Sequence, residues 1–128
     1  LADPYAMIGS DGLPTEGKPH PRLYGTMARV LGTYARDEGV ITLEDAVRKM
    51  TSLPAAKHRV AERGLLREGW YADIVVFDAE KVADVATYEE PRQYPSGIDY
   101  VLVNGEVAVE RGAQTAARAG RMLRRGRG

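Results

Sequence analysis

Three side chains that could do chemistry lie within the first 22 residues of the 128-residue chain: Asp11, His20 and Arg22. A carboxylate can accept a proton during hydrolysis and return it to a leaving group. A guanidinium presents a fork of donors that pairs bidentately with a carboxylate. Simpler interpretations stay open, because Ser10-Asp11-Gly12 is also typical of a turn and a loop arginine can pair within its own loop.

The chain offers few ligands for a metal ion. It has two histidines and no cysteine, so disulfide and thiolate chemistry are excluded within it. His20 has no second histidine two or four residues away, and a zinc site needs three or four protein ligands. We therefore expect His20 to orient its loop, His58 to lie in an exposed turn, and the chain alone to bind no zinc tightly.

The elements that would position these side chains begin with an apolar run. Residues 5–10 predict a short buried strand that ends at Asp11, and residues 13–22, with three prolines, predict a loop. A stripe of apolar residues at helical spacing then predicts a helix of about four turns that ends at Gly39. The stripe consists of Leu23, Met27, Val30, Leu31 and Tyr34, and Met27 is expected to lie in the core.

Two more helices are expected. Thr42 is a suitable N-cap, and Asp45 stands in the capping-box position. The buried face of this helix is predicted to consist of Leu43, Ala46, Val47 and Met50. Pro54 fits the first turn of a further short helix, which is expected from Ala55 to about residue 60.

The pattern changes to β after residue 63. Residues 74–77 form a β-branched and aromatic run that predicts a strand covered on both faces, with Trp70 and Tyr71 packing at a seam beside it. Asn104-Gly105 lies between two apolar runs and predicts a type I′ hairpin. The chain thus divides into a helical segment at 1–62 and a β segment at 63–128.

Composition excludes several classes. Formal net charge is zero, yet residues 111–128 carry six arginines and no acidic residue. No aromatic residue interleaves these arginines to stack on bases, so we expect a solvated basic tail and no nucleic-acid partner, with residues 125–128 lacking fixed structure. No apolar run exceeds four residues, so we expect no membrane span and a cytoplasmic location.

Several segments together carry a family resemblance. They are Ile8-Gly9-Ser10-Asp11-Gly12, His20-Pro21-Arg22-Leu23-Tyr24-Gly25-Thr26, residues 48–56, Arg63-Gly64, residues 69–78 and residues 120–124. The chain resembles the D-aminoacylases, or N-acyl-D-amino-acid deacylases, of the metal-dependent amidohydrolase superfamily. The resemblance covers only the C-terminal part of such an enzyme, and 128 residues are too few for a closed barrel of about 250.

The resemblance implies an α/β fold. Residues 1–62 would be the last strand and helices of a TIM-like amidohydrolase barrel, and residues 63–128 part of a small β-sandwich subdomain with a basic tail. Asp11 would be the catalytic carboxylate at the end of the last barrel strand and a candidate metal ligand. Arg22 would bind the carboxylate of an N-acyl-D-amino acid, with His20 beside it. Zinc would be the cofactor, with its other ligands upstream.

Two alternatives remain open at this point. The run at residues 72–78 is shared widely among amidohydrolases, including dihydroorotase- and hydantoinase-like cyclic amidases. The lack of metal ligands also fits a non-catalytic α+β interaction module. Under either enzyme interpretation we expect an unpaired strand edge within residues 73–109, through which the chain could self-associate.

Overall fold

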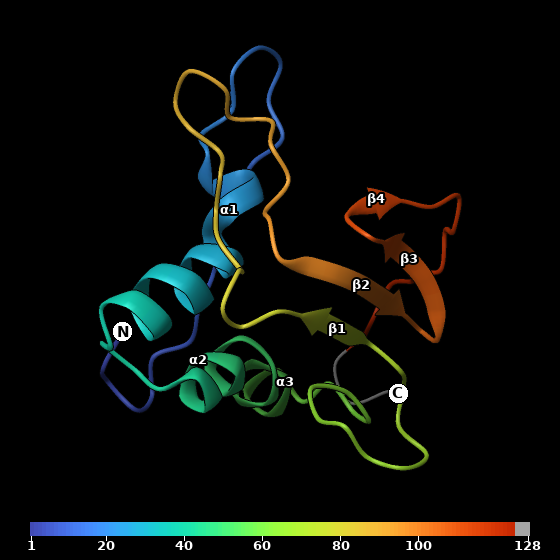
Figure 1. Ribbon diagram of the computed structural model, residues 1–128. Coiled ribbons are helices and arrows are strands. Elements are labelled where there is room, and N and C mark those ends of the chain that lie inside the picture. The colour runs from blue at the N-terminus through green and yellow to red at the C-terminus, as the bar shows by residue number, and fades with distance from the viewer. Residues whose placement is uncertain (125–128) are drawn as a thin grey trace.

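A computed structural model describes residues 1–124, in which helical segments precede an antiparallel sheet (Figure 1). The helices are α1 (Arg22–Arg29), η1 (Val30–Asp37), α2 (Leu43–Met50) and α3 (Ser52–His58). The strands are β1 (Ile74–Phe77), β2 (Ile98–Val103), β3 (Glu106–Glu110) and β4 (Ala113–Gln114). The prediction for residues 125–128 lies outside the described residues.

The long first helix is confirmed, but its second half is wider than an α-helix. α1 runs directly into the π-helical η1, after which the Glu38 N–H donates to the Thr33 carbonyl five residues back, at 2.9 Å. Gly39 then takes a positive φ of 61° and ends the helix. The expectation that Met27 is buried is wrong. Its side chain is 42% exposed, because the neighbouring Ala28 occupies the buried face.

α2 is capped as predicted but buries a different face. The Thr42 hydroxyl accepts the Asp45 N–H at 3.2 Å. Ala46 is fully buried, whereas Val47 is exposed, contrary to expectation. Lys49 is fully buried instead, and its ammonium group is satisfied by backbone carbonyls and by Asp45 at 3.6 Å. α3 also begins earlier than predicted, at Ser52.

The predicted strand at residues 5–10 is wrong. Its backbone bonds to α2 and forms no ladder: the Ile8 N–H donates to the Lys49 carbonyl at 3.2 Å, and Arg48 donates to the Pro4 carbonyl at 2.9 Å. The Lys49 ammonium donates to the Ala6 carbonyl at 3.3 Å and also to that of Asp3. A strand needs a neighbouring strand to pair with. Within residues 1–124 none lies beside this segment.

The four strands form one antiparallel sheet in the order β1-β2-β3-β4. The predicted hairpin is confirmed, since Asn104 and Gly105 both have positive φ, 51° and 86°. β1 is an edge strand, and Val75 and Val76, which point to opposite faces, are 51% and 45% exposed. The prediction that β1 is covered on both faces is therefore wrong. Self-association through this edge stays a prediction.

The core joins the helices to the chain that follows β1. Its buried apolar residues are Ala28, Val30, Leu31, Ile41, Ala46 and Val82. Gly32 is required where η1 meets Val82, because a Cβ there would come within 2.4 Å of the Val82 carbonyl oxygen. The core thus draws on both segments, and the boundary at residue 62 stays a prediction. None of the helices in residues 1–124 has the length and apolarity needed to cross a bilayer.

A second junction centres on Arg63, whose relative exposure is only 8%. Its guanidinium donates to Asp73 at the start of β1 and to the Asn104 side chain in the hairpin turn. The Tyr71 ring lies against two guanidinium groups, with Arg63 4.2 Å and Arg121 4.3 Å from its centroid. Arg63 therefore ties the segment after α3 to the sheet and to the C-terminal segment.

The charge of Asp73 depends on this junction. Burial raises the pKa of the Asp73 carboxyl, but hydrogen bonds from the Asn104 N–H and from Arg63 lower it more, so the net pKa lies below its ordinary value. A lowered folded-state pKa stabilises the fold above the unfolded-state pKa of about 4. This contribution is lost as the pH falls from there through the folded-state pKa.

Arg63→Met should lower the free energy of unfolding by about 3 kcal/mol, because it leaves Asp73 and Asn104 without their shared partner. Urea denaturation followed by circular dichroism measures the loss. Arg67→Met is the matched control: Arg67 is exposed and its guanidinium lies 5.2 Å from the Trp70 ring centroid, so the change should stay within about 0.5 kcal/mol. Equal losses for the two variants would contradict the assigned role of Arg63.

Candidate active site

Asp11 and Arg22, predicted from the sequence as site residues, form an ion pair. Arg22 Nη2 lies 2.7 Å from Asp11 Oδ2, and Arg22 Nε donates to the Asp11 backbone carbonyl at 2.9 Å. The pair is open to solvent, with 77% of the Asp11 side chain and 41% of the Arg22 side chain exposed. Exposed pairs contribute only about 0–1 kcal/mol. A ligand carboxylate could therefore displace Asp11 from Arg22 at little cost.

The start of α1 determines where Arg22 lies. A helix begins with N–H groups that have no partner within the helix. Here His20 Nδ1 accepts the Arg22 N–H at 3.0 Å, the His20 carbonyl accepts the Leu23 N–H at 3.0 Å, and the Pro21 carbonyl accepts the Tyr24 N–H at 3.1 Å. His20 thus supplies two acceptors to the first turn of α1, and its role in orienting the loop stays a prediction.

Asp11 takes an unusual backbone conformation. Its φ is 47°, a left-handed conformation that aspartate tolerates, and the Gly12 N–H donates to the Ser10 hydroxyl at 3.2 Å. A Cβ at Gly12 would come within 2.9 Å of Leu23 Cα, so only glycine lets this segment approach α1 so closely. The local backbone thus leaves the Asp11 carboxylate facing Arg22, and the catalytic interpretation of Asp11 stays a prediction.

A second loop, residues 84–95, lies beside the loop that carries His20 (Figure 1). Tyr88 Oη is 3.0 Å from His20 Nε2, and the two rings meet edge to face with centroids 5.1 Å apart. Arg92 donates to the backbone carbonyls of Thr15 at 3.1 Å and Gly17 at 2.8 Å. Sequence analysis missed this loop, since nothing local indicates that it folds back some 70 residues.

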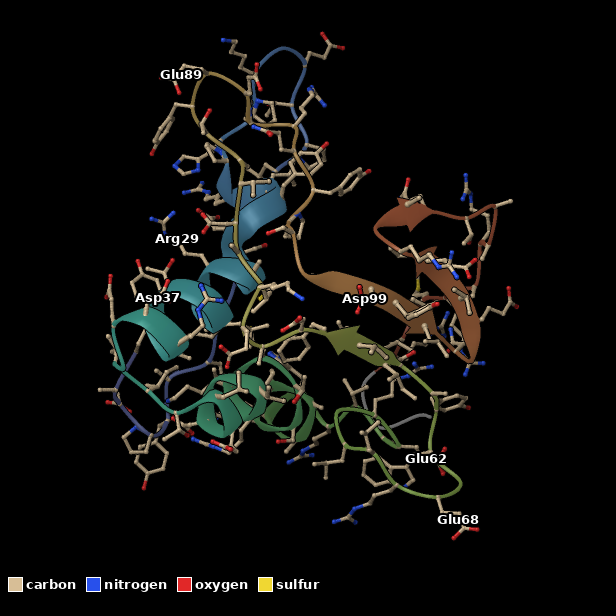
Figure 2. All side chains as sticks on the ribbon, in the orientation of Figure 1. Arg29, Asp37, Glu62, Glu68, Glu89 and Asp99 are labelled. Carbon is tan, nitrogen blue, oxygen red and sulfur yellow. The ribbon has the colours of Figure 1, made fainter. Side chains whose placement is uncertain are left out.

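The base of the 84–95 loop is also attached to α1. Arg29 donates to the Asp84 carboxylate at 2.7 Å, and the attraction of Asp84 raises the pKa of Arg29 above its ordinary value. Gly25 lies opposite, where a Cβ would come within 2.8 Å of Asp84 Cβ. Figure 2 shows Arg29 on the side of α1 that faces this loop, with Glu89 at the loop's tip.

The described residues do not form a metal site. Within residues 1–124 no three His, Cys, Asp or Glu side chains converge closely enough to hold an ion. Asp11 is one carboxylate, and its nearest charged partner is a cation. His58 is exposed at the end of α3. Any zinc centre would need most of its ligands from residues other than these.

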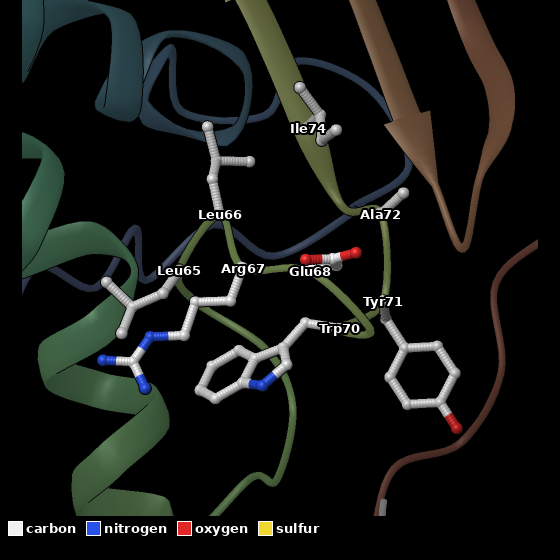
Figure 3. A pocket seen from close by; sticks show the side chains of 8 residues that line it. All are labelled: Leu65, Leu66, Arg67, Glu68, Trp70, Tyr71, Ala72 and Ile74. Atoms are coloured by element: carbon white, nitrogen blue, oxygen red, sulfur yellow. The ribbon is translucent and has the colours of Figure 1, made fainter.

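A shallow groove lies beside β1 (Figure 3). It is lined mainly by Leu65, Leu66, Trp70, Tyr71 and Ile74. Arg67 and Glu68 are the charged residues that line it. The groove is an apolar surface and offers no arrangement for acid–base chemistry.

Comparison with known proteins gives a match to one protein family. Residues 2–109 match the model of the amidohydrolase family. The chain belongs to this family. It is 55% identical over 119 residues to a D-aminoacylase of Alcaligenes xylosoxydans xylosoxydans, a match that covers 93% of the chain and 25% of that protein. From the same organism, an N-acyl-D-glutamate deacylase is 53% identical over 93% of the chain, and an N-acyl-D-aspartate deacylase 45% identical over 96%.

Solved structures of relatives match the fold as well. A D-aminoacylase crystal structure superposes with a TM-score of 0.91 at 55% identity, over 93% of this chain and 25% of that one. The N-acyl-D-glutamate deacylase of Bordetella bronchiseptica, solved with zinc and a phosphonate inhibitor, gives a TM-score of 0.81 at 50% identity, over 88% and 25% of the two chains. The amidohydrolase chain thus spans about a quarter of the length of the relatives it matches.

The 128-residue chain alone should retain far less than one zinc ion per molecule after loading and dialysis, because its ligand set falls short of three. Elemental analysis of the dialysed protein measures this, and an assay with an N-acetyl-D-amino acid should show no turnover. Stoichiometric zinc together with turnover would contradict the ligand inventory.

Proposed function

We propose that this chain is the C-terminal part of a zinc-dependent amidohydrolase that hydrolyses the amide of N-acyl-D-amino acids. The products would be a carboxylate and the free D-amino acid. The proposal takes the substrate class from the deacylases that the chain matches at 45–55% identity. The observation that carries it is the exposed Asp11–Arg22 pair, a proton acceptor next to a carboxylate-binding group.

Arg22 would bind the α-carboxylate of the substrate. Its guanidinium sits at the first turn of α1 and is already paired with one carboxylate, that of Asp11, through a single side-chain contact of 2.7 Å. A substrate carboxylate can make the bidentate pair that Asp11 does not make here. Binding would also bring the amide close to Asp11.

Asp11 would then act as general base and general acid. It would take a proton from the water that attacks the amide carbonyl, and later give this proton to the leaving nitrogen as the C–N bond breaks. The carboxylate suits both steps because it is exposed and not locked into a buried network. The described residues supply no metal site, so zinc would be held chiefly by residues outside them, with Asp11 within reach as one further oxygen ligand.

The proposal extends to the architecture. Residues 1–62 would form the C-terminal end of a TIM-like barrel and residues 63–128 part of a β-sandwich subdomain. The superposition on a quarter of D-aminoacylase supports this arrangement. The segment at 5–10 would then find a strand partner in the rest of the barrel, which fits its lack of a ladder in residues 1–124.

A chimera tests the function most sharply. The chain replaces the matching quarter of the Alcaligenes D-aminoacylase, and the folded chimera should hydrolyse N-acetyl-D-amino acids. Asp11→Asn should lower kcat by about 10²-fold or more with little change in KM, since it removes proton transfer in the transition state. Arg22→Lys should act mainly on KM, because a point charge replaces a fork.

Glu16→Gln is the matched control, an exposed carboxylate in the same loop that should leave both constants unchanged. Circular dichroism and size-exclusion chromatography establish that each chimera is folded. Near-full activity of the Asp11→Asn chimera would refute the role given to Asp11, and a folded, inactive parent chimera would refute the proposed function.

A further inference from the structure

Tyr88 contacts the site from far along the sequence. It lies 68 residues after His20, and its hydroxyl is 3.0 Å from His20 Nε2. The imidazole has two nitrogens, and the other one, Nδ1, accepts the Arg22 N–H at 3.0 Å. The His20 ring therefore joins Tyr88 to the first residue of α1.

The two contacts define the tautomer of His20. Because Nδ1 accepts a hydrogen bond from a backbone N–H, it carries no proton. The neutral ring then carries its proton on Nε2, which donates to the Tyr88 hydroxyl. Without that acceptor, the ring could rotate or exchange tautomers, and the Arg22 N–H would lose its partner.

The loop that carries Tyr88 is held in place. Ala83 and Ser96 exchange backbone hydrogen bonds at its base, at 3.3 and 3.0 Å. Within the loop, the Glu90 N–H donates to the Thr87 hydroxyl at 3.0 Å, which fixes the turn that includes Tyr88. At the far end of the loop, Arg92 donates to two backbone carbonyls of the loop that carries His20. The loop that positions Tyr88 beside His20 is therefore held by hydrogen bonds at its base, within its turn and at its far end.

We propose that Tyr88 is a positioning residue for Arg22: by holding the His20 ring in its Nε2-protonated form, it fixes the start of α1 and so the direction of the Arg22 guanidinium. This inference rests on the proposed function, in which Arg22 binds the substrate carboxylate. It adds a distant loop to the determinants of substrate binding. Tyr88 touches neither substrate nor reacting atoms.

The first test needs no activity. The chain has only two histidines, so nitrogen NMR of the intact 128-residue protein resolves His20 with His58 as internal reference. At a pH where both rings are neutral, His20 should be largely Nε2-protonated, and Tyr88→Phe should shift it to a tautomer mixture while His58 stays unchanged. An unaltered His20 tautomer in Tyr88→Phe would overturn the proposal, whatever the enzymatic activity.

The second test separates positioning from simple support. In the active chimera, Tyr88→Phe should raise KM for N-acetyl-D-amino acids by about three- to tenfold, the scale of one lost hydrogen bond, with kcat within about twofold. Tyr94→Phe removes a hydroxyl from the same loop and should change neither constant, since Tyr94 meets Tyr24 only through its ring.

His20→Asn completes a double-mutant cycle. The Asn amide oxygen can replace Nδ1 as acceptor for the Arg22 N–H but does not reach Tyr88, so adding Tyr88→Phe to His20→Asn should have no further effect. A full additional loss would mean that Tyr88 acts other than through His20, which overturns the proposal. An inactive parent chimera would instead count against the proposed function and leave the NMR test to decide.

Discussion

The need to cap α1 is the constraint on which the candidate site depends. The first N–H groups of a helix require acceptors, and here one residue, His20, supplies two of them through its ring and its carbonyl. Pro21, with its fixed φ, then starts the helix. Arg22 consequently lies in the first turn of α1, next to the segment that contains Asp11. The geometry of the pair follows from backbone hydrogen bonding rather than from the strength of the pair itself.

Contacts between distant segments hold this arrangement together. In the core, Val82 packs against η1. Arg63 links the segment after α3 to the hairpin. The 84–95 loop contacts His20 and the backbone of the loop that carries His20. The site is therefore built by the helical and the β segments together. Under the proposed function, this packing would let residues far from Arg22 affect substrate binding.

Local features were predictable because short-range chemistry determines them. Asn104-Gly105 requires positive φ at both positions, and Thr42 satisfies an N–H three residues away, so both are readable from a few residues. Asp11 and Arg22 were predicted from their chemistry together with the resemblance to the D-aminoacylases, and the structure brings them together. Their catalytic roles remain predictions.

The remaining features depend on partners distant in sequence. The run at residues 5–10 has strand composition, but strand formation depends on a neighbour, and here α2 binds the Ala6 carbonyl and the Ile8 N–H. Lys49 is charged, yet its burial is favourable because its ammonium group donates to two backbone carbonyls and pairs with the Asp45 carboxylate. Tyr88 reaches His20 only because the 84–95 loop folds back onto the other loop. Neither hydrophobic periodicity nor turn chemistry contains that information.

The central claim is that Arg22, positioned by the start of α1, receives the substrate carboxylate beside Asp11. The most direct measurement is a crystal structure of the chimeric deacylase bound to a D-amino acid product. The account predicts that the ligand carboxylate pairs with the Arg22 guanidinium and that the Asp11 carboxylate faces the ligand nitrogen. A ligand bound elsewhere, with Arg22 still paired to Asp11, would contradict it.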